Sequence, residues 1–272
     1  MDETKGGDVQ TSDPSAAVSV IERMTAVLDA FSAADDRIGV NEIARRSGLP
    51  KSTASRLVSS LVRHGYLERQ GHSVSVGLKL FELGKLSGQP NELRSLALPT
   101  MADLRNATRQ TVHLSVLEGT EVVYIGILPG LDSSALLSRV GGRLPAYATG
   151  AGKALLAFSS AEVVERVIER GFVAYQPGTI TNAGSLLREL EAIRRTRLAY
   201  SNAEAGPGVT GAASPILTAD ARAVAALSVS GRIGGFDPQK VGSAVHLAAL
   251  HLGRLSNAST LGRPQRGSER GV

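Results

Sequence analysis

Basic and hydroxyl-bearing side chains are concentrated in one stretch of the sequence, from Arg45 to Arg69. The stretch contains a single carboxylate, Glu68, and six cations: Arg45, Arg46, Lys51, Arg56, Arg63 and Arg69. Such a local excess of positive charge favours a polyanionic partner. Small hydroxyls allow close approach to base edges, arginine can bind guanine through two hydrogen bonds, and lysine or arginine can bind phosphate. The residue types therefore indicate binding to duplex DNA.

The apolar positions of the same stretch predict a helix–turn–helix. Val40, Ile43 and Ala44 share one face of a first helix, and Gly48 should end that helix. Pro50 suits the first turn of the second helix, where its missing N–H costs nothing. The apolar stripe of the second helix consists of Ala54, Leu57, Val58, Leu61 and Val62. Spacing alone also allows an ordinary helical hairpin with a solvated Ser/Arg face.

Flanking elements complete a predicted winged helix. Ser19 and Glu22 have the spacing of a capping box and predict a preceding helix. The segment YLERQGHSVSVG predicts a hairpin, or wing, with Gly71 and His72 at its tip. The start of the second helix of such a motif lies against base edges in the major groove, and a wing tip can reach the neighbouring backbone. The predicted DNA contacts are Arg45, Lys51, Ser52, Thr53, Ser55, Arg56, Arg63 and His72.

Two glycine-rich stretches in the second half of the chain are candidate ligand sites. ATGAGKALLAF is not a phosphate-binding loop, because Tyr147 and Ala154 replace required residues, and Leu155 breaks the dinucleotide fingerprint. A helix start rich in glycine remains, and it suits either a carboxylate or other small anion or close backbone packing. EAGPGVTGAASPI predicts a loop before an apolar strand, which either covers a pocket or only turns the chain.

The residue patterns of common enzymes and metalloproteins are missing from the sequence. None of the five histidines lies four residues from another, and the chain has no cysteine to assist in binding a metal. No serine lies in a G-x-S-x-G sequence. We therefore expect no enzyme activity, no metal and no cofactor. A metabolite-processing enzyme with an accessory basic domain is the less favoured alternative.

The composition is that of a globular protein with room for two domains. The 272 residues are 42% hydrophobic and 20% charged, with a formal net charge of +5. No apolar run is long enough to span a membrane, and the N-terminal MDETKGGDVQTSDPS lacks the apolar region of a signal peptide. The expected location is the cytoplasm, in association with the nucleoid.

The mixture of hairpins and helices after the winged helix predicts an α+β fold with an antiparallel sheet. Hairpins are expected around residues 118–121 and 218–221, and SSALLSRV is a further candidate strand. Ser87-Gly88-Gln89-Pro90 predicts a linker, Asn91 should cap the next helix, and Pro99 should kink or break it. The expected segments are a disordered tail (1–14), a winged-helix DNA-binding domain (15–77), a linker helix region (78–92), an effector-binding domain (93–256) and a disordered basic tail (257–272).

Four stretches in order resemble the IclR family of bacterial transcriptional regulators: SVIERMTAVLDAF, EIARRSGLPKSTASRLVSSLVRHGYLER, LPAYATGAGKALLA, and EAGPGVTGAASPI followed by ALSVSG. The similarity extends roughly from Val18 to Ser256. It implies an N-terminal winged helix, a linker helix and a C-terminal, GAF-like effector-binding domain. It also implies homodimers, often paired into tetramers, that bind partly palindromic operator DNA.

The resemblance further implies an effector pocket formed by Leu144, Gly150, Ala151, Ser201, Val209, Gly211, Ser228 and Ser230. The sequence departs from the family where some members have an acidic residue at Ser201 and a cysteine at Gly211. Gly39 also replaces a Ser or Thr helix cap, which weakens that cap. The implied function is a ligand-responsive transcriptional regulator, a repressor of a catabolic operon that is released or modulated by a small organic acid. An activator, and a nucleoid-type binder without sequence preference, are the alternatives.

Overall fold

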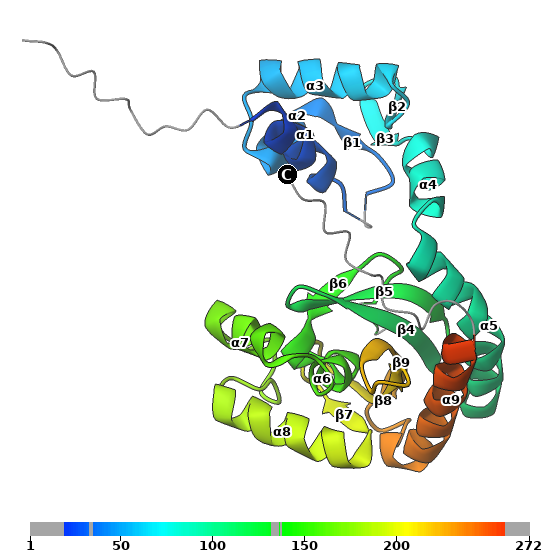
Figure 1. Ribbon diagram of the computed structural model, residues 1–272. Helices are drawn as coiled ribbons and strands as arrows, with labels where there is room; N and C mark the ends of the chain where they lie inside the picture. The colour runs from blue at the N-terminus through cyan, green and yellow to red at the C-terminus, as the bar shows by residue number, and fades with distance from the viewer. Residues whose placement is uncertain (1–18, 33–34, 132–135, 137, 259–272) are drawn as a thin grey trace, which may run out of the picture. The chain divides into compact units, whose positions relative to one another are not determined.

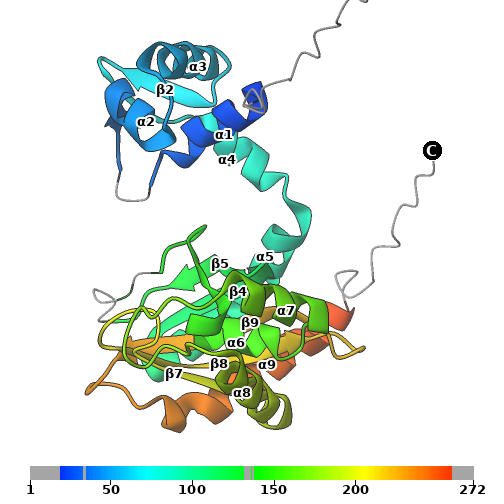
Figure 2. The same ribbon diagram turned by 90° about the vertical axis from the view of Figure 1, so that its left-hand side faces the viewer.

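The computed structural model describes residues 19–32, 35–131, 136 and 138–258. The chain divides into two compact units, Met1–Leu86 and Ser87–Val272, and each is described separately below (Figures 1 and 2). The predicted tail at 1–14 lies outside the described residues, as does the predicted basic tail beyond residue 258. No helix in the described part of the chain is long and apolar enough to cross a membrane.

The N-terminal unit is a helical fold with a small antiparallel sheet. Its elements are α1 (Val20–Asp29), β1 (Ile38–Gly39), α2 (Val40–Ser47), α3 (Lys51–Arg63), β2 (Leu67–Gln70), β3 (Ser73–Val76) and α4 (Leu78–Lys85). The sheet has the order β1-β3-β2. The core that joins the helices to this sheet contains Val27, Ile43, Val58, Leu61, Leu67 and Val74. The predicted winged helix-turn-helix is therefore confirmed.

Local signals in the sequence account for the ends of these helices. Ser19 Oγ accepts a hydrogen bond from Glu22 N at 3.1 Å, and Glu22 Oε2 accepts one from Ser19 N at 2.6 Å, which confirms the capping box. Gly48 ends α2 with φ of 66°, a left-handed conformation that glycine adopts without strain. Gly39 precedes α2 without a side-chain hydrogen bond, as expected for a weak cap. Pro50 lies one position earlier than predicted, at the N-cap of α3.

The C-terminal unit is built on a six-stranded antiparallel sheet of order β6-β5-β4-β9-β8-β7. Its strands are β4 (Thr111–Glu118), β5 (Glu121–Leu128), β6 (Arg143–Pro145), β7 (Ala199–Asn202), β8 (Val209–Leu217) and β9 (Ala223–Arg232). Its helices are α5 (Gly88–Thr108), the 3-10 helix η1 (Ala146–Ala148), α6 (Gly150–Leu156), α7 (Ala161–Arg170), α8 (Ala183–Thr196) and α9 (Pro238–Ala258). The structure confirms the predicted α+β fold and both predicted hairpins.

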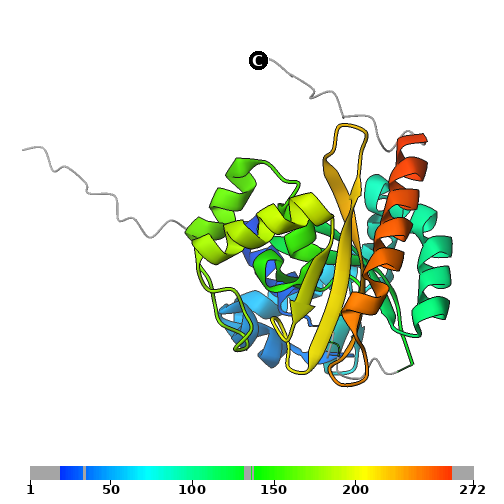
Figure 3. The same ribbon diagram turned by 90° about the horizontal axis from the view of Figure 1, so that it is seen from below.

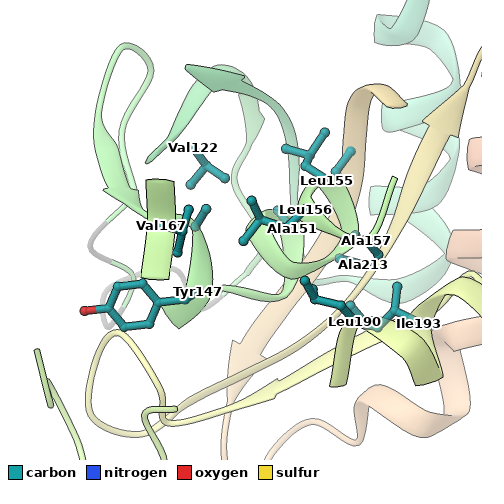
Figure 4. Close-up of a cluster of buried hydrophobic side chains, with 14 of the residues drawn as sticks. Val122, Tyr147, Ala151, Leu155, Leu156, Ala157, Val167, Leu190, Ile193 and Ala213 are labelled. Atoms are coloured by element: carbon teal, nitrogen blue, oxygen red, sulfur yellow. The ribbon is translucent and has the colours of Figure 1, made fainter. Parts of the chain in front are cut away.

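Helices cover both faces of this sheet, and alternate strand residues point to opposite faces. On one face α5 and α9 lie side by side, as Figure 3 shows, and enclose a core that includes Met101, Leu227 and Leu252. On the other face α6, α7 and α8 pack over a second core (Figure 4), which includes Leu155 and Leu190. Both faces are therefore apolar, which explains why β8 and β9 show long buried runs rather than a simple alternation.

Two predictions around α5, the Asn91 cap and a break at Pro99, are wrong. The boundary between the two units falls at Leu86/Ser87, where the linker was predicted, and Gly88, Gln89 and Pro90 form the first turn of α5, where a proline has no helical N–H bond to lose. Asn91 lies inside the helix, where its Nδ2 donates to Ser87 O at 2.7 Å. Pro99 does not break α5, which continues to Thr108; the proline is exposed, so water can solvate the carbonyl that loses its partner.

Two further predictions about strands require correction. Residues 133–135 and 137 of the candidate strand SSALLSRV lie outside the described residues, and 138–140 are not in a strand. Val209, Thr210 and Gly211 were expected in a loop, but they form the start of β8. Their pairing with β7 and β9 supplies the backbone hydrogen bonds that a loop would lack.

Candidate DNA-binding surface and ligand cavity

The first turns of α3 carry the predicted DNA-contacting side chains. Ala54, Val58 and Leu61 are buried on the inner face of the helix. The opposite face carries exposed Lys51, Ser52 and Arg56, with half-buried Thr53 and Ser55 beside them. Neither Lys51 nor Arg56 forms an ion pair with a carboxylate in the described part of the chain. Their charge is therefore available to a partner.

Two of the six cations counted from the sequence already have acidic partners. Arg45 Nη2 and Arg46 Nε each lie 2.6 Å from Glu42 Oε1, and Arg46 also forms an ion pair with Asp35. Hydrogen bonds from Arg45 and Arg46 lower the pKa of Glu42 to about 2. A hydrogen bond from Arg46 likewise lowers the pKa of Asp35 well below its usual value. The local excess of positive charge is thus smaller than the sequence suggested. Asp35 and Glu42 lie before residues 45–69 in the sequence, but in the fold they offset the charges of Arg45 and Arg46.

The remaining predicted DNA contacts are spread over the same unit. Arg45 is in α2 with 72% of its side chain exposed, and His72 is exposed at the tip of the β2–β3 hairpin. Arg63 is exposed in the last turn of α3, about 18 Å along the helix axis from Lys51. Arg63 therefore lies at the opposite end of α3 from Lys51, Ser52 and Thr53.

The C-terminal unit contains a cavity between α6 and the strands β7, β8 and β9. It encloses about 620 Å³ of empty space, including its open mouth. The eight residues predicted for the effector pocket all line it: Leu144, Gly150, Ala151, Ser201, Val209, Gly211, Ser228 and Ser230. They come from five separate elements, β6, α6, β7, β8 and β9, so folding brings together residues up to 86 positions apart in the chain.

The glycines of this region have different roles. A Cβ on Gly152 would lie 2.1 Å from Ala146 O, so α6 can pack against η1 only with glycine there. A Cβ on Gly211 would lie 2.8 Å from Val229 O, which accounts for glycine near the start of β8. Gly150 faces the cavity instead, and a Cβ there would meet Ser201 Oγ at 3.5 Å. Of the two interpretations left open for the helix start, close backbone packing thus applies to Gly152.

A buried lysine lies directly behind the cavity wall. Lys153 is 2% exposed, and its Nζ donates to Glu204 Oε1 and Tyr200 O, both at 2.8 Å, and to Glu189 Oε1 at 3.2 Å. These three acceptors use all the donors of an ammonium group. Thr149 Oγ1 caps the helix that carries Lys153 by accepting from Gly152 N. The lysine therefore anchors α6 to β7, to α8 and to the loop before β8.

The sequence prediction missed five polar residues of the cavity wall: His113, Tyr124, Ser138, Thr149 and Glu204. His113 lies in β4, with Nε2 2.7 Å from Ser138 Oγ and its ring centroid 5.3 Å from that of Tyr124. Burial lowers the pKa of His113 to about 4, so the imidazole is neutral at neutral pH. The signal in the sequence was a histidine inside the predicted strand TVHLSVL, but the local pattern could not distinguish a cavity wall from a core.

Glu204 is the one carboxylate of the described cavity wall. It is 8% exposed and precedes β8 in the loop after β7. Its Oε1 accepts from Lys153 and from Asn202 N at 3.3 Å, while its Oε2 has no hydrogen-bond partner within the described residues. Burial raises the pKa of Glu204, and the adjacent Lys153 ammonium opposes this shift. The ion pair with Lys153 thus engages one carboxylate oxygen, and the other is buried without a hydrogen-bond partner in the described part of the chain.

These two units define a class of protein. A winged helix with a polar, partly cationic recognition helix is a DNA-binding module, and a separate domain with a cavity lined by polar and apolar side chains is a ligand-binding module. The described residues contain no group of three or more metal-ligating side chains. The combination is that of a ligand-responsive DNA-binding regulator.

The chain belongs to the IclR family of bacterial transcriptional regulators. The family model described as "Bacterial transcriptional regulator IclR C-terminal" matches residues 88–253, and the "IclR helix-turn-helix domain" matches residues 20–71. The members of this family are transcriptional regulators rather than enzymes, in agreement with the expectation from the sequence. Its partners are accordingly DNA and a small-molecule ligand.

Relatives in sequence and structure support this assignment. The HTH-type transcriptional regulator XynR of Escherichia coli K12 is 31% identical over 216 residues, which are 78% of this chain and 86% of XynR. The regulator KdgR of the same organism is 32% identical over 219 residues, 79% of this chain and 82% of KdgR. The crystal structure of an IclR homologue from Microbacterium hydrocarbonoxydans, complexed with 4-hydroxybenzoate, is 31% identical with a TM-score of 0.82, covering 89% of this chain and 100% of the other.

Proposed function

We propose that this regulator represses a catabolic operon and that a small organic acid releases or modulates the repression. The observation that carries the proposal is the exposed face of α3, where Lys51 and Arg56 have no carboxylate partner in the described part of the chain. A repressor that its ligand releases must bind its operator in the absence of that ligand, and this face supplies side chains for bases and phosphates. Activation of the same target is the alternative outcome of the same binding.

The proposed DNA contacts follow from where each side chain lies. Lys51, Ser52, Thr53, Ser55 and Arg56, in the first turns of α3, would contact base edges and nearby phosphates. Arg45, Arg63 and His72 lie away from that start, and we assign them to the phosphate backbone. Because this target is chromosomal DNA, we also propose that the protein works in the cytoplasm at the nucleoid.

The proposed effector site is the cavity of the C-terminal unit. Ser201, Ser228 and Ser230 offer hydroxyls to a carboxylate, and Leu144 and Val209 offer apolar contact. Gly150 and Ala151 begin α6, where backbone N–H groups have no partner within the helix. The similar structure from Microbacterium hydrocarbonoxydans contains 4-hydroxybenzoate, a carboxylic acid, which supports an acid of this size as the class of effector.

We further propose that the protein binds its operator as a homodimer, with pairs of dimers as a larger assembly. All eight residues of α4 lack burial within the N-terminal unit, and Leu78 and Phe81 are 70% and 61% exposed. A second copy of the chain is the occupant we infer for this apolar face, because a partly palindromic operator requires two recognition helices. The two half-sites should then lie about 34–36 Å apart, or a multiple of that distance.

Measurement of operator affinity tests the proposal. The operator can be isolated by selecting genomic fragments with the purified protein, and affinity followed by fluorescence anisotropy at several salt concentrations. Arg56→Ala should weaken specific binding by about 1–3 kcal/mol and leave ligand affinity unchanged. Arg166→Ala, which removes one exposed arginine from α7 of the other unit, is the matched control. Equal affinity of R56A and wild type for the operator would exclude Arg56 from the interface, and a sequence-indifferent binder would show no preferred fragment.

A further inference from the structure

The charges in the wall of the cavity restrict what can bind there. No arginine or lysine is among the described residues that line the cavity. Lys153 lies behind the wall, where its ammonium group donates to three acceptors. His113 is neutral because burial lowers its pKa to about 4, and Tyr124 keeps its proton because burial raises its pKa to about 12. The one other ionisable side chain in the described wall is Glu204, whose carboxylate forms an ion pair with Lys153 at 2.8 Å.

One oxygen of Glu204 is unused. Lys153 and Asn202 N bind Oε1 and fix the side chain, whereas Oε2 is buried without a hydrogen-bond partner in the described part of the protein. A buried carboxylate oxygen that stays unpaired is costly, and a ligand that donates a hydrogen bond to it removes that cost. A ligand carboxylate placed there would instead meet a like charge in a poorly solvated site.

We propose that Glu204 determines effector specificity: its Oε2 accepts a hydrogen bond from a hydroxyl or amino group of the ligand, and its charge excludes ligands with a second carboxylate. The effector is then a monocarboxylic acid with a donor group away from its carboxylate. This inference rests on the proposed role of the cavity as the effector site. It goes further by assigning a residue that the resemblance to the family did not supply.

Two matched sets of compounds test the proposal. One set is benzoate, 4-hydroxybenzoate, 4-aminobenzoate and terephthalate; the other is propionate, 3-hydroxypropionate, 3-aminopropionate and succinate. Within each set the acids differ only in whether the far position carries hydrogen, a hydroxyl, an amine or a second carboxylate. Titration calorimetry on the full-length wild type needs no variant, and the hydroxyl and amine members show which donor Glu204 accepts.

In at least one set, we expect a donor-bearing acid to bind wild type at least tenfold more tightly than its unsubstituted counterpart, and the dicarboxylate not to bind. Glu204→Gln should reduce the tenfold difference to less than threefold and allow the dicarboxylate to bind. Glu189→Gln is the matched control, because Glu189 is the other carboxylate on Lys153 but does not line the cavity. It should keep the wild-type selectivity, and melting curves should show that both variants are folded.

Three outcomes would overturn the proposal: a dicarboxylate or unsubstituted acid that binds wild type as tightly as the donor-bearing acid, equal loss of selectivity in E189Q and E204Q, or no binding by any member of either set. Operator binding by the same wild-type preparation without acid is measured in parallel. Specific operator binding together with one of these outcomes refutes the role of Glu204 and leaves the DNA-binding function intact.

Discussion

Replacing Lys153 by methionine removes the buried cation while keeping most of the volume of the side chain. The substitution deletes three hydrogen bonds and leaves Glu204, which is 8% exposed, with Asn202 N at 3.3 Å as its remaining donor. Breaking a buried ion pair on one side costs about 3–5 kcal/mol, because a charge is left buried and uncompensated. For a unit of this size, that loss corresponds to a decrease of roughly 6–20 °C in melting temperature.

Matched double variants show which carboxylate causes the loss of stability in K153M. The far-ultraviolet circular dichroism of the full chain during urea or thermal unfolding reports the loss, and tyrosine fluorescence reports mainly the C-terminal unit, which contains four of the five tyrosines. Adding Glu204→Gln to K153M should recover stability, since the stranded charge disappears. Adding Glu189→Gln should recover little, because 38% of the Glu189 side chain is exposed and water can solvate it.

The pH dependence gives a second, independent readout. Burial already raises the pKa of Glu204, and loss of Lys153 removes the group that opposes this shift. An acid whose pKa is raised in the folded state contributes stability at low pH that is lost as pH rises through the folded value. The deficit of K153M relative to wild type should therefore be smaller at about pH 5 than at about pH 7.5. A deficit that is independent of pH, or that E204Q does not reduce, would refute the reasoning.

Two other substitutions test the packing and the charges described above. Gly152→Ala should destabilise the C-terminal unit by about 1–3 kcal/mol, because the added Cβ would lie 2.1 Å from Ala146 O. The control Gly150→Ala should fold normally, since its Cβ meets its nearest atom at 3.5 Å. Urea denaturation compares the two variants, and equal stability would contradict the close packing of η1 on α6. Arg46→Ala should lower the melting temperature of the N-terminal unit. Because the pKa of Glu42 is lowered to about 2, the difference in melting temperature between R46A and wild type should diminish as pH falls toward this value and as the salt concentration rises. A difference that depends on neither pH nor salt would show that these ion pairs do not stabilise the unit.

Much of the fold follows from local pattern in the sequence. The capping box at Ser19, the left-handed stop at Gly48 and the hairpin with its tip at His72 depend on residues a few positions apart, so their types alone predict the geometry. The predicted break at Pro99 was wrong because a proline breaks a helix only where the carbonyl that loses its partner would be buried. Burial is a property of the folded chain, and local sequence does not contain it.

The candidate site divides in the same way between sequence and tertiary structure. The sequence by itself determined which residue types are available, and similarity of motifs identified eight positions that the fold gathers around one cavity. The tertiary structure alone decided which ionisable groups are paired, neutral or free to bind a partner. It pairs Lys153 with Glu204, 51 residues away, buries His113 as a neutral group, and neutralises Arg46 with Asp35. Such long-range pairs arise because burial makes an unpaired charge costly, and only folding determines which charges are buried together.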